Sequence, residues 1–420
     1  MLELFPNSAR IEAGELELGG VAASSLAERF GTPLVAYCER TLRQRAGSFR
    51  EAVGADGRVF YGTKAFPSVA LLRLLREEGI GADVASAGEL AFARAAGLTG
   101  PGLVVHGNNK DEPLLREAAR ESAPVVLDAP DEVELAVAAG VREVLVRVTL
   151  GVDADTHEAI VTGHRGSKFG LPPDAAEKVV ARALAQGLDV LGLHVHVGSQ
   201  LPDFTAQAET IERLAAFAAR CRDSLGWVAR VADLGGGFGI RHHPDEVVPD
   251  ATELARAATS TARDAFATAG LRQPETWLEP GRALVGHAGV TLYRVGAVKR
   301  LEETTWVAVD GGMSDNPRPQ LYDARYTALS AIRADEAATE TVSVAGMHCE
   351  SGDVLIDDVA LPSPRRGDLL AVPATGAYTL AMSSNYNGVG RPAAVLVGGS
   401  ESRLIRRRET VDDLLALETA

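Results

Sequence analysis

The chain has 420 residues, of which 46% are apolar and 24% are charged, and its formal net charge is −15. This length predicts two domains of an ordinary globular protein, and the negative charge argues against a nucleic-acid-binding protein, which would carry clustered Lys and Arg. Three scattered cysteines form neither a disulfide framework nor a metal motif, and no apolar run approaches the roughly 18–20 residues of a membrane span.

From residue 58 to residue 282, short apolar runs alternate with helix-forming segments. The runs are nearly continuous in apolar residues, as strands buried on both faces are. The intervening segments, such as residues 68–79 and 173–187, have apolar residues at helical spacing. Eight such pairs over about 225 residues are the count and size of a (β/α)8 barrel. The predicted strands are residues 58–65, 81–86, 102–107, 124–129, 143–150, 190–198, 231–237 and 276–282.

After Arg282 the pattern changes to β-like runs separated by turns, at residues 290–301, 305–312, 341–349 and 393–399. Little helix-forming sequence lies between them. The fold class predicted is therefore α/β plus all-β, with a TIM-like barrel over residues 30–285 and a C-terminal β-sandwich or β-barrel domain over residues 286–420. Residues 1–29 are expected to pack on the second domain.

The predicted barrel strands end on polar or glycine residues. In this fold the active site is built at the C-terminal ends of the strands, so such residues at every strand end predict a site. They are Lys64, Asp83 with Ser86, His106, Asp128, Arg147, His194 with His196, Gly235 to Gly237, and Glu279 with Arg282.

Two glycine-containing stretches, GGGFG at 235–239 and EPGR at 279–282, follow the seventh and eighth strands. Tight turns alone also favour glycine. Loops at these two places in such barrels frequently bind phosphate, because backbone without side chains lets N–H groups close on the anion. With Ser199 nearby, a phosphate cradle is the preferred interpretation.

Lys64 lies in the otherwise apolar stretch VFYGTKAF. A strand-end lysine is most often simply exposed to solvent. Apolar surroundings would instead desolvate the ammonium and lower its pKa, which makes the amine a better nucleophile toward a carbonyl. A lysine facing a phosphate site suggests pyridoxal 5′-phosphate held as a Schiff base. Glu279 would then keep the pyridine nitrogen protonated, and His196 would stack on the ring.

Six motifs occur in a fixed order: YGTKA (61–65), HVHVGSQ (194–200), DLGGGFG (233–239), EPGR, CESGD (349–353), and the series GAY, SSNYNG and RPA between residues 376 and 393. Together they resemble the fold-type III pyridoxal-phosphate-dependent decarboxylases, which include the ornithine and diaminopimelate decarboxylases. Further stretches, at 106–110, 156–170 and 311–324, are similar to the diaminopimelate decarboxylases in particular. YGTKAF departs from the YAxKAN of many members.

The resemblance implies a role for each matching residue. Lys64 carries the cofactor, His196 stacks on it and Glu279 pairs with its ring nitrogen. The distal carboxylate of the substrate is bound by Arg282, Arg318 and Tyr322, and its distal amino group by Glu350. Other cofactor-binding residues are Asp83, Ser199, Gly235, Gly236, Gly237, Gly281, Arg282 and Tyr378, and Tyr378 and Tyr386 also lie near the substrate.

The implied reaction is decarboxylation of meso-2,6-diaminopimelate to L-lysine and CO2, the last step of lysine biosynthesis. Arg318 favours this substrate over ornithine, because an arginine fork suits a distal carboxylate. Three alternatives stay open: a decarboxylase of ornithine, arginine, a D-amino acid or a polyamine precursor, a homologue that has lost catalysis, and a racemase.

The carbanion left by loss of CO2 needs a proton donor, and both Lys64 and Cys349 are candidates. A buried, inert thiol is the commonest state of a free cysteine. The resemblance instead makes Cys349 the proton donor and places it in the active site of a neighbouring subunit, so a homodimer with shared sites is expected. The charges of Glu350 and Asp353 are also poorly suited to a core strand. The N-terminus lacks a signal-peptide pattern, so we expect a cytoplasmic enzyme with no membrane partner.

Overall fold

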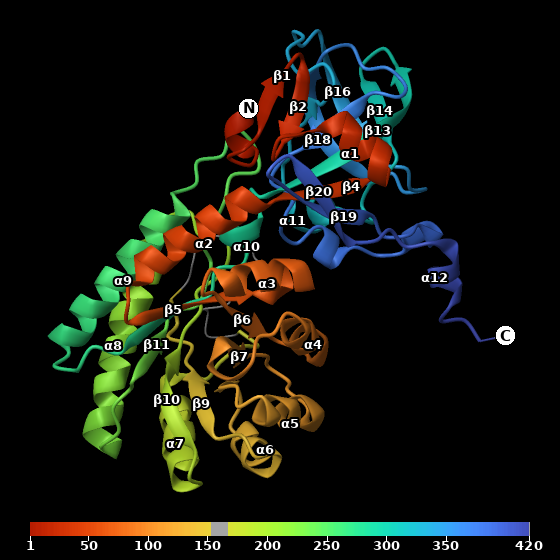
Figure 1. Cartoon of the computed structure of the whole chain (residues 1–420). Helices are drawn as coiled ribbons and strands as arrows, with labels where there is room; N and C mark the ends of the chain where they lie inside the picture. The colour runs from red at the N-terminus through yellow and green to blue at the C-terminus, as the bar shows by residue number, and fades with distance from the viewer. Residues whose placement is uncertain (153–166, 420) are drawn as a thin grey trace. The chain divides into compact units, whose positions relative to one another are not determined.

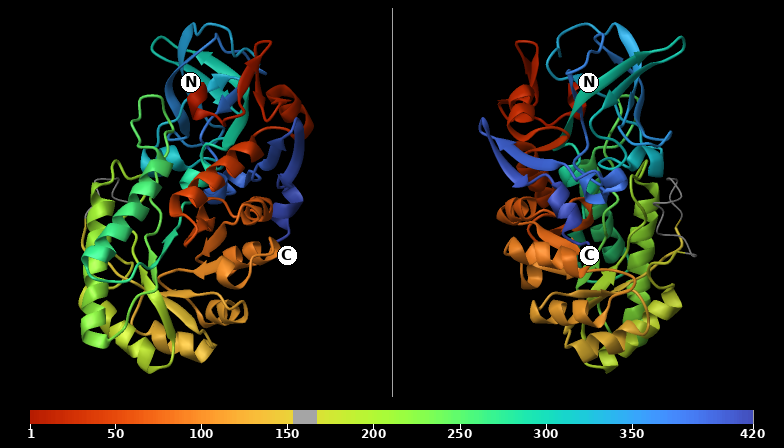
Figure 2. Two further views of the ribbon diagram at one scale, coloured as in Figure 1. Left: turned by 60° about the vertical axis from the view of Figure 1, so that its left-hand side comes forward. Right: turned by 90° about the vertical axis from the view of Figure 1, so that its right-hand side faces the viewer.

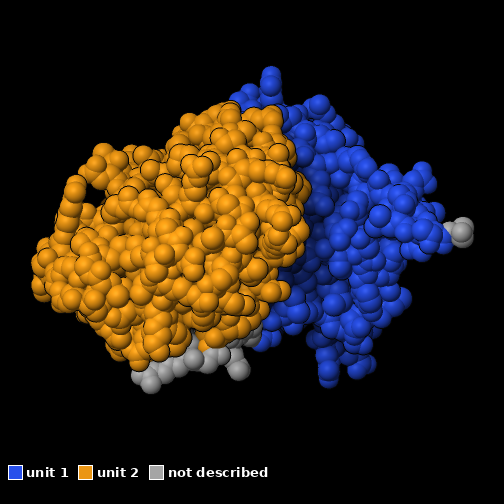
Figure 3. Space-filling view, turned by 90° about the horizontal axis from the view of Figure 1, so that it is seen from below, with its two compact units in different colours: residues 1–44, 240–247, 284–420 blue, residues 45–239, 248–283 orange. Residues whose placement is uncertain are grey.

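The computed structural model describes residues 1–152 and 167–419, so most of the motif at residues 156–170 lies outside the described residues. The chain forms two compact units (Figure 3). The barrel unit comprises residues 45–239 and 248–283. The sheet unit comprises residues 1–44, 240–247 and 284–420.

The barrel unit contains a closed barrel of eight parallel strands, in the order β10-β11-β12-β5-β6-β7-β8-β9. Every strand falls within, or within one residue of, a run predicted from the sequence, so the predicted (β/α)8 barrel is confirmed. The strands are β5 (Gly57–Gly62), β6 (Gly81–Val84), β7 (Leu103–Val105), β8 (Val125–Leu127), β9 (Glu143–Arg147), β10 (Asp189–His194), β11 (Val231–Asp233) and β12 (Glu275–Leu278).

Helices surround the barrel on its outside (Figures 1 and 2). Their apolar faces cover the strands, whose own inward side chains, such as Phe60, Leu145 and Trp277, fill the barrel interior. Ser86 at one strand end caps the following helix by accepting the N–H of Glu89. The helices are α3 (Val69–Glu77), α4 (Ala87–Ala95), α5 (Glu112–Arg120), α6 (Glu132–Ala139), α7 (Pro173–Ala185), α8 (Thr205–Leu225) and α9 (Ala251–Thr268).

The sheet unit contains a mixed nine-stranded sheet and a three-stranded sheet, which confirms the predicted β domain. The long strand β13 pairs with β4 and β18 through its first half and with β14 through its second half. The strands are β1 (Arg10–Glu12), β2 (Glu15–Leu18), β3 (Val21–Ala22), β4 (Leu34–Cys38), β13 (Gly289–Arg300), β14 (Thr305–Val309), β15 (Leu329–Ser330), β16 (Glu340–Ala345), β17 (Val354–Leu361), β18 (Leu369–Val372), β19 (Ala393–Gly398) and β20 (Glu401–Arg406).

Strand β4 lies within the range 30–285 that the sequence assigned to the barrel. In the structure it is hydrogen-bonded to β13 and β19 of the nine-stranded sheet. All five of its residues are buried, and its even-numbered residues join the apolar core of the sheet unit. The remaining helices are α1 (Ala23–Phe30), α2 (Glu39–Val53), α10 (Arg282–Val285), α11 (Arg318–Tyr322) and α12 (Val411–Leu415).

Of the helices within residues 1–152 and 167–419, none is long and apolar enough to cross a membrane.

Candidate active site

The strand register brings the predicted strand-end residues to one end of the barrel. Asp83 on β6 is aligned with Gly62 on β5, just before Lys64. His194 on β10 is aligned with Asp233 on β11 and with Arg147 on β9. The side chains that the sequence placed at strand ends therefore form neighbouring groups in space.

Glu279 is the centre of a buried cluster. Its Oε1 lies 2.5 Å from Nε2 of His106, and its Oε2 lies 3.3 Å from Nε2 of His194. The two imidazole rings meet edge to face, with centroids 4.8 Å apart. Both histidines were predicted as strand-end residues, but their contact with Glu279 was not predicted. HVH marked His194 as a candidate, and nothing in the sequence linked His106 to it.

Burial acts to raise the pKa of Glu279, but the charges and hydrogen bonds of His106 and His194 outweigh it and lower that pKa well below its usual range. Asp233 beside it has its pKa raised well above the usual range by burial and by the Glu279 charge. Burial also lowers the pKa of His194 to about 3. At neutral pH Glu279 is therefore the ionised carboxylate of this cluster, beside a protonated Asp233.

The four side chains His106, His194, Asp233 and Glu279 have ligand atoms that all lie within 4.8 Å of one another, and such groups can hold metal ions. The sequence predicted no metal, and that stays a prediction. The contacts of both histidines with Glu279 already account for the orientation of the two rings.

Lys64 lies in a short 3-10 turn that follows β5. Its Nζ is 3.6 Å from Oδ2 of Asp83, whose side chain is buried. Burial raises the pKa of Asp83, although His106 and Lys64 act against this. The expectation of a desolvated ammonium was wrong, because the side chain of Lys64 is 57% exposed. The turn directs it away from the apolar residues that flank it in the sequence.

The loop Gly235 to Gly237 needs its glycines for steric reasons. Gly235 and Gly237 have φ of +68° and +94°, in the left-handed region that favours glycine. A Cβ at Gly237 would lie 2.5 Å from the carbonyl oxygen of Gly198, and one at Gly236 would clash with the carbonyl oxygen of Glu279. The backbone of the loop is therefore packed closely against its neighbours and carries no side chains.

Two N–H groups of this loop donate within the chain. The N–H of Gly235 donates to Asp233 at 3.0 Å, and the N–H of Gly236 donates to Nδ1 of His196 at 3.2 Å. Burial lowers the pKa of His196 well below its ordinary value, so its ring is neutral and its Nδ1 can accept. His196 lies two residues beyond the end of β10.

Arg282 and Ser199 are in contact, since Nη2 of Arg282 donates to Oγ of Ser199 at 3.3 Å. Gly281 lies beside the end of β5, because its Cα is the nearest atom to the position that a Cβ on Gly62 would occupy. Lys64, Asp83, the glycine loop, Glu279 and the Arg282–Ser199 pair thus belong to one end of the barrel unit.

A second polar group, which the sequence analysis only partly named, lies beside this cluster. Nζ of Lys110 is 2.9 Å from Oε1 of Glu132, and both side chains are buried. The other oxygen of Glu132 accepts the N–H of Asp128 at 2.6 Å. Asp128 is also 3.6 Å from Nη1 of Arg147. Lys110 belongs to the stretch 106–110, HGNNK, that resembles the diaminopimelate decarboxylases, but nothing in the sequence indicated its partner.

The remaining predicted site residues belong to the sheet unit. Cys349 and Glu350 lie in the turn between β16 and β17, and both are exposed. The alternative of a buried, inert Cys349 is therefore wrong for this unit, whereas Cys38 and Cys221 are buried. The hydroxyl of Tyr386 donates to Oε2 of Glu350 at 3.4 Å.

Asp353 directly precedes β17 and is not part of a strand, in line with the expectation that its charge is poorly suited to a core strand. Its side chain is buried and accepts the N–H groups of Met313 at 2.6 Å and of His348 at 2.9 Å. These hydrogen bonds compensate for the desolvation of the carboxylate. Asp353 thus fixes the turn that carries Cys349.

Arg318 and Tyr322 lie on the single-turn helix α11. Arg318 is buried, its Nε donates to the hydroxyl of Tyr326 at 2.8 Å, and its guanidinium lies 5.7 Å from the Tyr322 ring centre. Tyr378 is half-buried and has a left-handed φ of 58°. These two groups and Cys349 belong to a different unit from Lys64.

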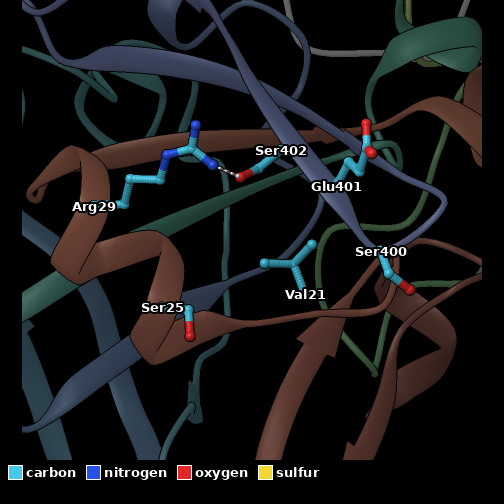
Figure 4. Close-up of a pocket in the computed structure, with 6 residues that line it drawn as sticks. All are labelled: Val21, Ser25, Arg29, Ser400, Glu401 and Ser402. Atoms are coloured by element: carbon cyan, nitrogen blue, oxygen red, sulfur yellow. Dashed lines mark hydrogen bonds between the residues drawn. The ribbon is translucent and has the colours of Figure 1, made fainter.

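A pocket of the sheet unit is lined by residues of the first helix region and of the β19–β20 hairpin (Figure 4). Arg29 reaches across it and donates to Oγ of Ser402 at 3.2 Å. Among the described residues that line this pocket, none was predicted for the active site. The lining residues are Val21, Ser25, Arg29, Ser400, Glu401 and Ser402.

A barrel with a lysine after its first strand, a glycine loop after its seventh and a buried glutamate after its eighth defines a class of enzyme. Residues 39–286 match the pyridoxal binding domain of the pyridoxal-dependent decarboxylases. The chain is 43% identical to diaminopimelate decarboxylase of Bacillus subtilis, over 99% of this chain and 98% of the relative. It is 45% identical to that of Actinosynnema pretiosum, over 99% and 95%.

A solved structure of diaminopimelate decarboxylase from M. jannaschii in complex with L-lysine superposes with a TM-score of 0.92, at 33% identity over 99% of this chain and 98% of that one. The chain therefore belongs to the diaminopimelate decarboxylase family of pyridoxal-dependent decarboxylases. It is a decarboxylase, and its cofactor is pyridoxal 5′-phosphate.

The residues present fit this cofactor. The glycine loop presents backbone without side chains, the amine of Lys64 lies at the same barrel end, and Glu279 is an ionised carboxylate in a buried position. These are the three groups needed for a phosphate, an aldehyde and a pyridine nitrogen.

Proposed function

We propose that this chain converts meso-2,6-diaminopimelate to L-lysine and CO2. The observation that carries the proposal is the group of Lys64, the glycine loop and Glu279 at one end of the barrel, in a chain similar along its whole length to diaminopimelate decarboxylases. When bound, pyridoxal phosphate supplies an electron sink that accepts the electron pair left when the bond to the carboxylate breaks.

Lys64 supplies the amine that attaches the cofactor, and Asp83 at 3.6 Å keeps that amine in place. Glu279 would hold the ring nitrogen, since its negative charge is maintained by His106 and His194. The half-buried, neutral ring of His196 would lie against the cofactor. The N–H groups of Gly235 and Gly236 donate within the chain. We therefore assign phosphate binding mainly to Gly237, Gly281, Ser199, Arg282 and Tyr378.

Recognition of the substrate's far end is assigned to the sheet unit. Arg318 offers a guanidinium oriented by its bond to Tyr326, and Tyr322 lies beside it, so the pair suits a carboxylate. Glu350, positioned by Tyr386, suits the distal ammonium group. Arg282 and Tyr378 complete the substrate contacts in this proposal. These residues match a substrate that carries both a carboxylate and an ammonium group at its far end. They do not match ornithine, which has no distal carboxylate.

Two groups can deliver the proton to the carbon that has lost CO2: Nζ of Lys64 and Sγ of Cys349. We assign the step to Cys349. Its exposed position on the sheet unit allows it to reach a bound substrate, and neighbouring Glu350 would contact the same molecule. Exposure of this turn also suits a homodimer in which each chain lends Cys349 to the other. The homodimer and a cytoplasmic location stay predictions.

The assignment of substrate is tested by CO2 release from a panel of amino acids: meso-diaminopimelate, ornithine, arginine, lysine and D-amino acids. We expect turnover of meso-diaminopimelate to exceed that of every other member by orders of magnitude. Ornithine turnover that equals or exceeds it would make the chain a decarboxylase of another basic amino acid. Lys64→Ala serves as the inactive control, since it removes the attaching amine.

The role of Cys349 is tested with Cys349→Ala. Loss of a positioned proton donor typically lowers the rate by a factor of about 10² to 10⁴, and we expect kcat to fall in this range with the cofactor still bound. Cys221→Ala is the matched control, because Cys221 is a buried thiol in helix α8. Undiminished turnover of Cys349→Ala would leave Lys64 as the proton donor.

A further inference from the structure

Hydrogen bonds to Asp353 hold the turn that carries Cys349 as far as His348, the residue before Cys349. Asp353 accepts the N–H of His348 at 2.9 Å and that of Met313 at 2.6 Å. A Cβ at Gly346 would clash with the Asp353 carboxylate, so the backbone also packs closely here. These contacts anchor the turn to the loop at 311–316 but leave the peptide of Cys349 itself to be held by something else.

Asn387 holds that peptide. Its Oδ1 accepts the N–H of Cys349 at 3.1 Å and lies 3.3 Å from Nδ1 of His348. A backbone N–H can only donate, so the amide presents its oxygen to the turn. The same oxygen then accepts from Nδ1 of His348, and Nε2 of that ring lies 2.8 Å from Oγ of Ser314. Four residues form one continuous chain of hydrogen bonds.

The conformation of Asn387 is specialised for this contact. Its φ is 54°, in the left-handed region, where asparagine is found more often than most other residues. The ring of the preceding residue, Tyr386, lies 5.5 Å from the buried ring of His348. The segment 386–388 therefore rests on the turn by a ring contact and by the amide of Asn387.

We propose that Asn387, acting with His348, is the positioning residue for Cys349, and this proposal rests on the proposed role of Cys349 as proton donor. A proton donor works only when it is held within hydrogen-bond reach of its target, and misplacement by about 1 Å can cost 10²-fold in rate. The amide of Asn387 fixes the backbone from which the thiol of Cys349 projects. His348 in turn fixes the amide, because its Nδ1 donates to the same oxygen while its Nε2 is held 2.8 Å from Oγ of Ser314.

The test compares Asn387→Gly with Asn387→Asp. Glycine removes the acceptor and tolerates the left-handed φ, whereas aspartate keeps an acceptor oxygen in the same place. For Asn387→Gly we expect kcat to fall about tenfold, the equivalent of one hydrogen bond of ordinary strength, with KM within a factor of about two. Asn387→Asp should recover most of the rate. Asn385→Ala is the matched control, since Asn385 lies in the same segment but bonds to Val389 and Glu409.

A second measurement does not depend on catalysis. The amide hydrogen of Cys349 should exchange with solvent about tenfold faster in Asn387→Gly than in the unmodified protein, and at close to the original rate in Asn387→Asp. Should Asn387→Gly fail to fold, His348→Gln gives the same comparison, because it loses the donor to Asn387 and retains reach to Ser314.

The outcomes separate this proposal from the one on which it rests. Unchanged kcat and unchanged amide exchange in Asn387→Gly would overturn the positioning role, even where Cys349→Ala is inactive. Full activity of Cys349→Ala would instead overturn the proton-donor role, and faster exchange in Asn387→Gly would then still show that Asn387 fixes the turn.

Discussion

Replacing Lys110 by methionine tests the buried ion pair beside the cofactor site. The side chain of Lys110 is 0% exposed, and its Nζ contacts Oε1 of Glu132 at 2.9 Å and donates to the carbonyl of Gly107 at 2.5 Å. Methionine fills a similar volume but leaves the Glu132 carboxylate buried, with the N–H of Asp128 as a remaining donor. Removing one partner of a buried pair typically costs about 3–5 kcal/mol.

Protonation of the unpaired Glu132 carboxylate gives an independent upper limit on the loss of stability. Glu132 can escape its buried charge by taking up a proton, which at about pH 7 costs about 3.7 kcal/mol, given an ordinary glutamate pKa of about 4.3. At about pH 5.5 the same uptake costs only about 1.6 kcal/mol. Burial of an unpaired carboxylate favours its neutral form, so the free-energy cost of the substitution grows as the pH rises. The destabilisation should therefore shrink on acidification.

The assay is urea unfolding of the barrel unit, followed by the fluorescence of Trp227 and Trp277 in a Trp306→Phe background, because Trp306 belongs to the sheet unit. Lys110→Met should lose about 3–4 kcal/mol near pH 7 and about half of that or less near pH 5.5. The double variant with Glu132→Gln, which keeps an acceptor for Asp128, should recover most of the loss. A loss below about 1 kcal/mol, or one that does not depend on pH, would refute the reasoning.

Three further predictions follow from the site and the sheet unit. Burial raises the pKa of Asp315 to about 7, so the folded sheet unit keeps a proton that the unfolded chain releases near pH 4. The free energy of unfolding should therefore fall as the pH rises through this window. In Asp315→Asn, urea unfolding followed by Trp306 fluorescence should show a free energy of unfolding that depends less on pH. An unchanged slope would count against that pKa. Gly236→Ala should weaken binding of pyridoxal phosphate at least about tenfold in titrations of the cofactor-free protein, because its Cβ would clash with the carbonyl of Glu279, whereas Gly47→Ala, with nothing within 4 Å, should bind normally. Glu279→Gln should retain the cofactor, and its kcat should fall by a factor on the order of 10², because a neutral amide cannot keep the pyridine nitrogen protonated. A fall in kcat of less than about threefold would argue that His106 or Asp233 keeps this nitrogen protonated instead.

The sequence was sufficient to predict the barrel and its strand ends, because each strand is a short local run and parallel strands must end on the same side. It could not predict that Lys64 is exposed, since this depends on a three-residue turn and not on the apolar composition around it. The assignment of β4 is similar: its apolar run reads the same in a barrel and in a mixed sheet, and only partners far along the chain decide.

The contacts of Glu279 with His106 and His194 show the same limit at the site. Each residue was visible as polar at a strand end, but the pairing depends on the position of strands around a closed barrel. The Asn387 contact with Cys349 joins the end of the β-like run predicted at residues 341–349 to the separate motif SSNYNG, and nothing in the sequence indicated that the two meet. Side-chain pairing between distant loops leaves no periodic trace, whereas secondary structure does.

The position of β4 also has a consequence for how the chain is made. Its partners β13 and β19 emerge from the ribosome only after the whole barrel has been translated, on the order of tens of seconds later. During that interval β4 is an apolar strand with both edges unpaired, which is the kind of segment that aggregates. Nascent chains that end before β19 should therefore depend on chaperones more than the full-length chain does, although their barrel unit is already complete in sequence.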